Sequence, residues 1–261
     1  MSQAPDEQAI HQVWSAYWSS METVAPWDSL SEMILRTLEQ ETNGFAQSAV
    51  MEAGCGTGRI SYQIARVGAK VTCLDITSEA LDLARATFGD LPANFVQASI
   101  LDIPKDQRFD LVWNAGVLEH FTLEDQRKSI AEFLSVLDEG GRVVILTPYS
   151  RSPLYRLAKW ILELAGRWPY GVEVPKASLS DCLPAEGVLE REYTMASLPL
   201  LFDAHKFLTP LRGPSRWLWR ALLERFGSEH LARWDRQLSR WFGGYLLVSV
   251  IRPATAAVPS R

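Results

Sequence analysis

The segment 50–58 has the residue types and spacing of a turn that binds a nucleotide. A short apolar strand is predicted to end at Glu52. Glycine accepts positive φ and, having no Cβ, lets a ligand approach the main chain. A helix predicted over 59–67 would direct the partial positive charge of its N-terminus at that ligand. Three glycines occupy the turn at alternate positions: Gly54, Gly56 and Gly58.

A second acidic residue, Asp75, follows Gly54 by 21 positions, at the end of a strand predicted over 70–74. In folds that bind dinucleotides, an acidic residue about 20 positions after the first glycine accepts hydrogen bonds from ribose hydroxyls. Asp75 is therefore the predicted ribose ligand. The alternative is a turn or capping carboxylate, because a helix is predicted to start at Ser78.

The charge and spacing of this turn favour a cationic ligand over a pyrophosphate. Dinucleotide turns have the pattern Gly-x-Gly-x-x-Gly, whereas the third glycine here, Gly58, comes one residue early. The carboxylate of Glu52 would also repel a pyrophosphate. An NAD-dependent oxidoreductase is therefore the less favoured interpretation.

The pattern Glu-x-Gly-x-Gly-x-Gly closely resembles the first motif of class I S-adenosylmethionine-dependent methyltransferases, whose cofactor carries a sulfonium and an ammonium group. Segments 71–75, 94–104, 109–120, 140–148 and 245–251 resemble the later motifs and strands in order. The resemblance implies S-adenosyl-L-methionine as the cofactor. It also implies an α/β Rossmann-like fold: a mostly parallel seven-stranded sheet, helices on both faces, an N-terminal helical lid and a helical insertion before the last strand.

The resemblance also assigns cofactor contacts. The family usually has an acid at the position of Ser99, whose hydroxyl could still bond the adenine amino group. Ile100 would give a backbone N–H and an apolar wall, and Asn114, at the end of the fourth strand, would lie near the methionine moiety. The implied cofactor-binding residues are Glu52, Gly54, Gly56, Gly58, Asp75, Ile76, Ser99, Ile100 and Asn114.

Methyl transfer from a sulfonium is an in-line displacement, so the acceptor atom must sit about 3–3.5 Å from the methyl carbon. An oxygen or carbon acceptor usually also needs a base. His120 is the predicted base, since its ordinary pKa suits neutral pH, and Glu119 would orient it or face the substrate. The alternative is a structural pair that bonds the backbone at the start of the next helix.

Acceptor contacts are predicted from three regions. Tyr17 and Trp18 lie in the N-terminal helix that would cover the cofactor, and Tyr149 follows the fifth strand; each has a core role as its alternative. Arg216 and Arg220 lie in the insertion 198–242, which holds four tryptophans and eight basic residues. Its apolar residues have helical spacing on both sides of Gly227-Ser228, with Trp219, Leu222, Leu223 and Phe226 in one stripe and Leu231, Trp234, Leu238 and Trp241 in the next.

Three interpretations of this insertion stay open: a cap that selects an acidic or amphipathic acceptor, two helices packed on the sheet, or a peripheral membrane contact. Before it, a helix is predicted from Ser152-Pro153 to Gly166, with Leu154, Leu157, Ala158, Ile161 and Ala165 facing inward. The predicted organisation is a lid (1–44), a cofactor-binding core (45–150), a helical cap with one core strand near 188–196 (151–242), the last strand (243–252) and a tail (253–261).

Composition sets the remaining limits. A chain of 261 residues with 47% hydrophobic residues can form a full core, and its net charge of −5 argues against a broad nucleic-acid footprint. The three cysteines, Cys55, Cys73 and Cys182, have no metal-ligand spacing. There is no apolar run long enough to span a membrane and no signal-peptide pattern, so a cytoplasmic location is predicted. The oligomeric state stays open.

These observations predict a methyltransferase that acts on a small organic, sugar or lipid-like acceptor. O-methylation is favoured, with C- and N-methylation open. Enzymes that methylate nucleobase amines carry Asp/Asn-Pro-Pro-Tyr/Trp after the fourth strand, and this chain has Asn114-Ala-Gly-Val117 there. A non-catalytic S-adenosylmethionine-binding protein is the alternative from a different class.

Overall fold

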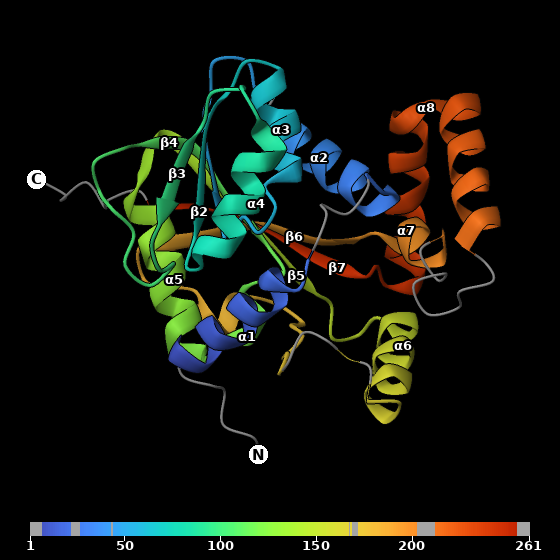
Figure 1. Ribbon diagram of the computed structural model, residues 1–261. Helices are drawn as coiled ribbons and strands as arrows, with labels where there is room; N and C mark the ends of the chain where they lie inside the picture. The colour runs from blue at the N-terminus through green and yellow to red at the C-terminus, as the bar shows by residue number, and fades with distance from the viewer. Residues whose placement is uncertain are drawn as a thin grey trace, which may run out of the picture.

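A computed structural model describes residues 7–21, 27–42, 44–166, 168, 172–202 and 212–254, with the backbone alone at 200–202 and 212–216. Its centre is a seven-stranded sheet in the order β3-β2-β1-β4-β5-β7-β6 (Figure 1). Only β7 runs antiparallel to its neighbours. The predicted fold class is confirmed. The strands are β1 (Ala49–Ala53), β2 (Lys70–Asp75), β3 (Asn94–Gln97), β4 (Phe109–Ala115), β5 (Leu137–Pro148), β6 (Gly187–Met195) and β7 (Leu246–Pro253).

Helices cover both faces of the sheet. Successive strand residues point to opposite faces, so Val50 packs with the helices of one face and Met51 with those of the other. The first face carries α2, α3 and α4, and the second carries α5. The helices are α1 (Glu7–Ser19), α2 (Ser29–Thr42), α3 (Arg59–Arg66), α4 (Ser78–Phe88), α5 (Leu123–Ser135), α6 (Pro153–Leu164), α7 (Ser197–Phe202) and α8 (Arg212–Phe242), with short 3₁₀ helices η1 (Leu118–His120) and η2 (Ser180–Cys182).

The sheet places its functional edge between β1 and β4. The chain proceeds from β1 outward to β2 and β3, then crosses to β4 on the other side of β1. At such a switch point the loops after the two strands diverge and leave a crevice at their carboxyl ends. The turn that begins after Glu52 and the segment after Ala115 therefore face each other there.

The helix predicted after Ser152 forms as α6, but the predicted inward face is wrong. Leu154, Leu157 and Ile161 are 48%, 53% and 51% exposed. The buried residue is Tyr155, whose ring packs on Tyr245 with centroids 5.0 Å apart. Its hydroxyl donates to Glu173 at 2.6 Å, and these contacts fix which side of α6 meets the protein. Ala158 is half-buried and Ala165 exposed.

The insertion 198–242 contributes α7 and the long helix α8. Gly227, with φ of 74°, breaks α8 into two parts at the predicted position. Trp219 and Leu231 are buried as their stripes predict, whereas Trp234 and Trp241 are 42% and 83% exposed. The main contacts of α8 are with α7, β6 and α2, so the described part of the insertion packs against one side of the molecule.

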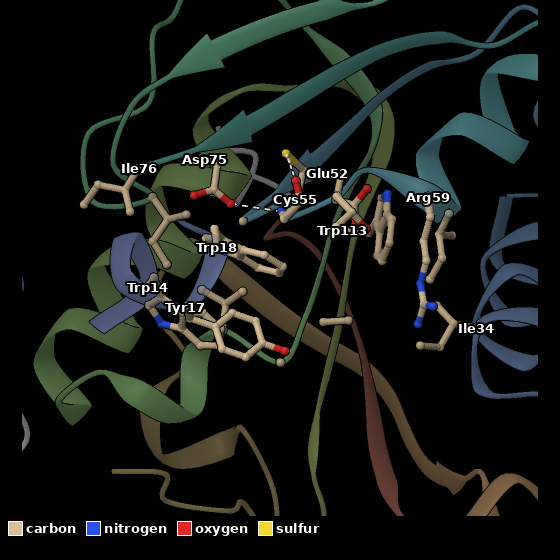
Figure 2. A pocket seen from close by; sticks show the side chains of 18 of the residues that line it. Trp14, Tyr17, Trp18, Ile34, Glu52, Cys55, Arg59, Asp75, Ile76 and Trp113 are labelled. Carbon is tan, nitrogen blue, oxygen red and sulfur yellow. Dashed lines mark hydrogen bonds between the residues drawn. The ribbon is translucent and has the colours of Figure 1, made fainter. Parts of the chain in front are cut away.

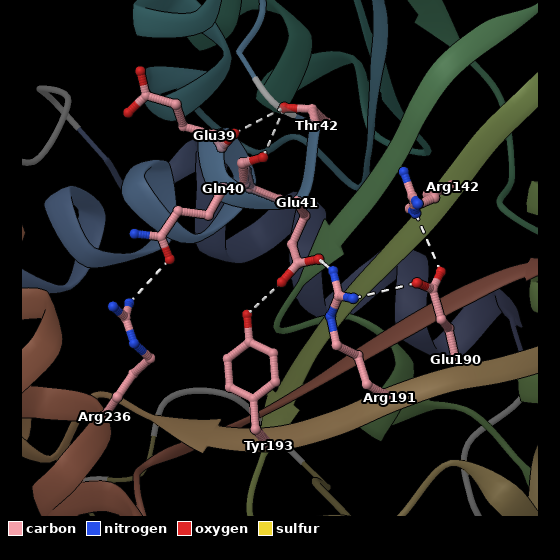
Figure 3. Close-up of polar contacts among 10 residues, drawn as sticks. Glu39, Gln40, Glu41, Thr42, Arg142, Glu190, Arg191, Tyr193 and Arg236 are labelled. Atoms are coloured by element: carbon pink, nitrogen blue, oxygen red, sulfur yellow. Dashed lines mark hydrogen bonds and ion pairs between the residues drawn. The ribbon is translucent and has the colours of Figure 1, made fainter.

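A polar network fastens α2 to β6 and α8 (Figure 3). Glu41, near the end of α2, is buried. One of its carboxylate oxygens accepts from the Tyr193 hydroxyl at 2.8 Å, and the other pairs with Arg191. Arg236 of α8 donates to Gln40 at 2.9 Å. The network fixes the helix that forms one wall of the cavity described below.

Replacing Glu41 with Ala should lower the free energy of unfolding by about 1–3 kcal/mol, because Tyr193 and Arg191 both lose a buried charged partner. Glu39→Ala is the matched control: it removes a carboxylate of the same helix that pairs with Arg36 but is 44% exposed. Its effect should stay under about 1 kcal/mol. Urea denaturation of both variants measures the difference, and equal midpoints would contradict the anchoring role.

Candidate active site

A cavity of about 460 Å³ opens at the carboxyl ends of β1, β2 and β4 (Figure 2). This volume lies within the range of small-molecule sites. The loops after these strands form its floor, and α1 and α2 form its other walls. Nine of the residues predicted to contact cofactor or acceptor line it: Tyr17, Trp18, Glu52, Gly54, Gly56, Asp75, Ile76, Ser99 and Ile100.

The glycine turn leaves no room for side chains. Gly56 has φ of 51°, and a Cβ there would lie 2.7 Å from the ring of Trp18. Gly54 has φ of 80°, and its Cβ would lie 2.6 Å from Val117. The third glycine, Gly58, faces the core instead, where its Cβ would meet Ala84 and Phe88 at 3.2 Å. Gly54 and Gly56 thus expose main chain to the cavity, whereas Gly58 allows the close packing of α3.

Asp75 is held rigidly at the end of β2. One carboxylate oxygen accepts from the Gly56 N–H at 3.0 Å. The other accepts from the Thr77 N–H at 3.0 Å and the Thr77 hydroxyl at 2.9 Å. Burial raises the pKa of this carboxyl, and these hydrogen bonds oppose the shift. Asp75 therefore links the glycine turn to the next loop and keeps a fixed acceptor at the cavity wall.

Glu52 presents an unsatisfied carboxylate to the cavity. It is 7% exposed, and among the described residues its Oε2 has no hydrogen-bond partner. Burial raises its pKa to about 8, and the charge of Asp75 contributes in the same direction, whereas hydrogen bonding to Ser61 and the charge of Arg59 oppose the shift. A buried carboxylate oxygen without a partner is costly in the ligand-free protein, and a cationic ligand would relieve that cost.

Two donors missed by the sequence analysis line the same end of the cavity. Arg59, at the start of α3, pairs with Asp28 at 3.4 Å. Trp113 is fully buried, and its indole Nε1 has no partner among the described residues. Trp113 is paired in register with Glu52 across β1 and β4. Paired residues of neighbouring strands share a face, so the strand alignment was the signal that could have identified Trp113.

Asn114 does not line this cavity. It follows Trp113 on β4, so its side chain points to the other face of the sheet. There its amide donates to the Ala53 carbonyl at 3.1 Å. Ser99 does line the cavity, and its hydroxyl accepts from the Leu101 N–H at 3.0 Å.

His120 and Glu119 lie behind the cavity wall and do not line it. His120 is buried, its Nδ1 lies 2.8 Å from the Val172 carbonyl, and its ring meets Trp14 edge-on at 5.3 Å. Burial lowers its pKa. Glu119 is 2% exposed, and burial raises its pKa well above the ordinary value. Its Oε1 would lie 3.7 Å from a Cβ at Gly116, which does line the cavity.

Two other predicted acceptor contacts, Tyr149 and Arg220, do not line this cavity. Tyr149 donates its N–H to the Tyr245 carbonyl at 2.8 Å; it is Tyr245 that lines the cavity. Arg220 is exposed on α8, and the side chain of Arg216 lies outside the described residues. Within the described chain, no group of three or more His, Cys, Asp or Glu residues is arranged to bind a metal, and no helix could cross a membrane.

A family model and curated relatives both indicate a methyltransferase. Residues 50–141 match a family model described as a methyltransferase domain. The ubiquinone biosynthesis O-methyltransferase of Actinobacillus pleuropneumoniae serotype 7 is 32% identical over 114 residues, which cover 41% of this chain and 49% of that protein. Its Proteus mirabilis counterpart is 28% identical over 139 residues, covering 52% of this chain and 56% of that protein. The chain thus spans about half the length of these relatives.

Solved structures share the fold. The N-methyltransferase NodS of Bradyrhizobium japonicum, in complex with S-adenosyl-L-homocysteine, superposes with a TM-score of 0.55 at 16% identity, covering 72% of this chain and 91% of its own. The [4+2]-cyclase SpnF superposes with a TM-score of 0.58 at 15% identity, covering 97% of this chain and 98% of its own. Residues 50–141 therefore form a methyltransferase domain, and the sheet order around it is that of the Rossmann-like fold shared with these class I methyltransferase structures.

Proposed function

We propose that this protein binds S-adenosyl-L-methionine in the cavity and transfers its methyl group to a small organic, sugar or lipid-like acceptor. The observation that carries the proposal is the buried carboxyl of Glu52, whose Oε2 has no partner among the described residues, beside a turn of main chain exposed by Gly54 and Gly56. The ammonium and sulfonium of S-adenosylmethionine would favour the ionised form of Glu52, whereas the phosphates of a dinucleotide would oppose it. An NAD cofactor fits this site poorly.

Each part of the cofactor has a matching group in the cavity. Asp75 accepts from the ribose diol, because each of its oxygens has a second lone pair. Ser99, Ile76 and Ile100 surround the adenine. Glu52 binds the ammonium group of the methionine moiety, while Arg59 and the indole N–H of Trp113 face the carboxylate of that moiety. The opposite charges of Glu52 and Arg59 suit the zwitterionic end of an amino acid.

When bound, S-adenosyl-L-methionine would supply a methyl group to an acceptor oxygen, giving S-adenosyl-L-homocysteine, while the proton of the acceptor passes to a base or to solvent. Tyr17, Trp18 and Trp14 of α1 form the wall that would exclude water and align the acceptor. O-methylation is favoured because the A. pleuropneumoniae and P. mirabilis relatives carry that name. The roles of His120 as base and Glu119 as its partner stay predictions. Trp14 lies between His120 and the cavity, and Gly116 lies between Glu119 and the cavity.

Two measurements test the proposal. Calorimetry should show binding of S-adenosyl-L-methionine and of its demethylated product, and no binding of NAD. Incubation with a panel of phenols, catechols, sugars and lipid quinols should yield S-adenosyl-L-homocysteine and a methylated product. Binding without turnover would favour a second candidate, a cofactor-binding protein of this fold that does not transfer a methyl group. The second candidate stays open because this chain also resembles a structure described as a [4+2]-cyclase, and a fold does not determine the reaction.

Replacing Asp75 with Asn should weaken cofactor binding at least tenfold. A charge-assisted hydrogen bond is worth about 1.5–3 kcal/mol, and the amide would also turn a donor toward either Gly56 or Thr77. Asp90→Asn, an exposed site in the same part of the chain, is the control and should bind normally. Isothermal titration of both variants measures the effect. Unchanged affinity in Asp75→Asn would contradict the ribose assignment.

A further inference from the structure

Helix α6 carries a continuous apolar stripe on its outer side. Five large side chains, spaced three, four or seven positions apart along most of the helix, face solvent, which is the reverse of what an amphipathic helix in a soluble domain normally does. Figure 1 shows α6 standing out from the body of the molecule below α7 and α8. The exposed residues are Leu154 (48%), Leu157 (53%), Trp160 (57%), Ile161 (51%) and Leu164 (70%).

Two exposed aromatic residues at the end of α8 lie near the start of α6. Trp241 and Phe242 are 83% and 67% exposed. The next residue, Gly243, approaches the start of α6: a Cβ there would lie 3.5 Å from the Arg151 carbonyl and 3.8 Å from Ser152 Cα. We call the stripe together with Trp241 and Phe242 the α6 surface. Contiguous apolar surfaces of this kind on a soluble domain mark interaction sites.

The charges around the α6 surface are mostly positive. Arg151 and Arg156, at the start of α6, are exposed, as is Arg240 beside Trp241. The exposed acid on α6, Glu163, is paired with Lys159 at 2.8 Å. The chain as a whole carries a net charge of −5, so this local excess of arginine is not a consequence of composition. An apolar face bordered by tryptophan and arginine fits an anionic lipid surface, where the arginines meet headgroups and the apolar side chains enter the boundary with the acyl chains.

We propose that the α6 surface docks the protein on anionic phospholipid membranes, with α6 lying flat in the interface. A helix of 12 residues is about 18 Å long, too short to span a bilayer. The inner side of the same helix reaches the cavity, because Tyr155 packs on Tyr245, which lines it. Docking would therefore bring the cavity near the lipid surface. The proposal concerns binding alone and does not depend on methyl transfer.

Vesicle flotation of the full chain tests this proposal. The protein should float with vesicles of equal parts phosphatidylcholine and phosphatidylglycerol, and should stay in solution with phosphatidylcholine alone. Leu157→Glu with Ile161→Glu should abolish flotation. Both sites are exposed, so the fold should persist, as circular dichroism can check. The matched control is Leu123→Glu with Val67→Glu, two apolar residues that are 47% and 58% exposed on other elements, and it should float normally.

The charge component has its own pair of variants. Arg151→Gln with Arg156→Gln should lower the lipid partition coefficient about tenfold or more, since each basic residue near the surface contributes appreciably. Arg66→Gln with Arg85→Gln, exposed arginines on α3 and α4, should leave it unchanged. Equal flotation on neutral vesicles, or flotation insensitive to the α6 variants, would overturn the proposal. So would light scattering that shows a dimer dissociated by Leu157→Glu with Ile161→Glu without lipid binding, because the occupant would then be a second copy.

Discussion

Replacing Glu52 with Gln should make the cofactor-free protein more stable at pH 7 while lowering its affinity for S-adenosyl-L-methionine. Burial raises the pKa of Glu52 to about 8 from an ordinary value of 4.5. Unfolding lowers it again, so at pH 7 the folded state holds a proton that the unfolded state has released. The difference corresponds to roughly 3 kcal/mol against folding, which the uncharged amide would largely remove.

The pH dependence has a definite sign. Because the folded-state pKa is raised, the penalty from Glu52 is absent below about pH 4.5, grows as the pH rises and levels off above about pH 8. The gain in Glu52→Gln should therefore appear at pH 7 and vanish near pH 4. Urea denaturation at both pH values measures it, with Glu139→Gln, an exposed site, as a control that should show no such change. A variant no more stable than the parent at pH 7 would contradict the raised pKa of Glu52.

The same substitution separates stability from function. Loss of the carboxylate that faces the ammonium group should reduce cofactor affinity at least tenfold, as expected for one charge-assisted hydrogen bond. Ligand stabilises the folded state by mass action. The variant should therefore melt above the parent without cofactor and show a smaller shift on cofactor addition. A larger shift would show that Glu52 does not contact the cofactor.

Replacing Gly56 with Val should eliminate measurable cofactor binding. The added Cβ would lie 2.7 Å from Trp18, so the side chain must displace the aromatic wall of the cavity or occupy the space of the ligand. A β-branched residue is also strained at φ of 51°. Isothermal titration should show no heat of binding at cofactor concentrations that saturate the parent.

Gly89→Val separates these two causes. Gly89 has φ of 54°, close to that of Gly56, but a Cβ there meets nothing within 4 Å. Both variants should lose stability through backbone strain, about 1–3 kcal/mol each. Only Gly56→Val should lose the cofactor. If Gly89→Val lost it equally, the effect of Gly56→Val would be one of folding and not of access.

The sequence by itself determined the parts that depend on neighbouring residues. The turn after Glu52 needs positive φ at Gly54 and Gly56, and only glycine adopts positive φ readily. The turn can therefore be predicted from the sequence alone. The start of α4 at Ser78, as predicted, depends on neighbouring residues in the same way. The resemblance of successive segments to the methyltransferase motifs then implied the mostly parallel sheet.

Only the tertiary structure decided which side chains share a wall. Trp113 and Asn114 are adjacent in sequence, and the register of β4 against β1 sends Trp113 to the cavity and Asn114 away from it. His120 is turned toward Val172, a residue 52 positions further along the chain. No local pattern carries such information, because it arises from the pairing of distant segments.

The same reason explains α6 and the insertion. The spacing of its apolar residues showed that α6 has an apolar face. Such spacing does not tell whether that face packs against the protein itself or against another partner. The contacts of Tyr155 with Tyr245 and Glu173 oriented α6 the other way. In α8, packing against β6 and α2 left Trp241 outside. Patterning fixed the existence of these helices, and their partners fixed which surface they present to the environment.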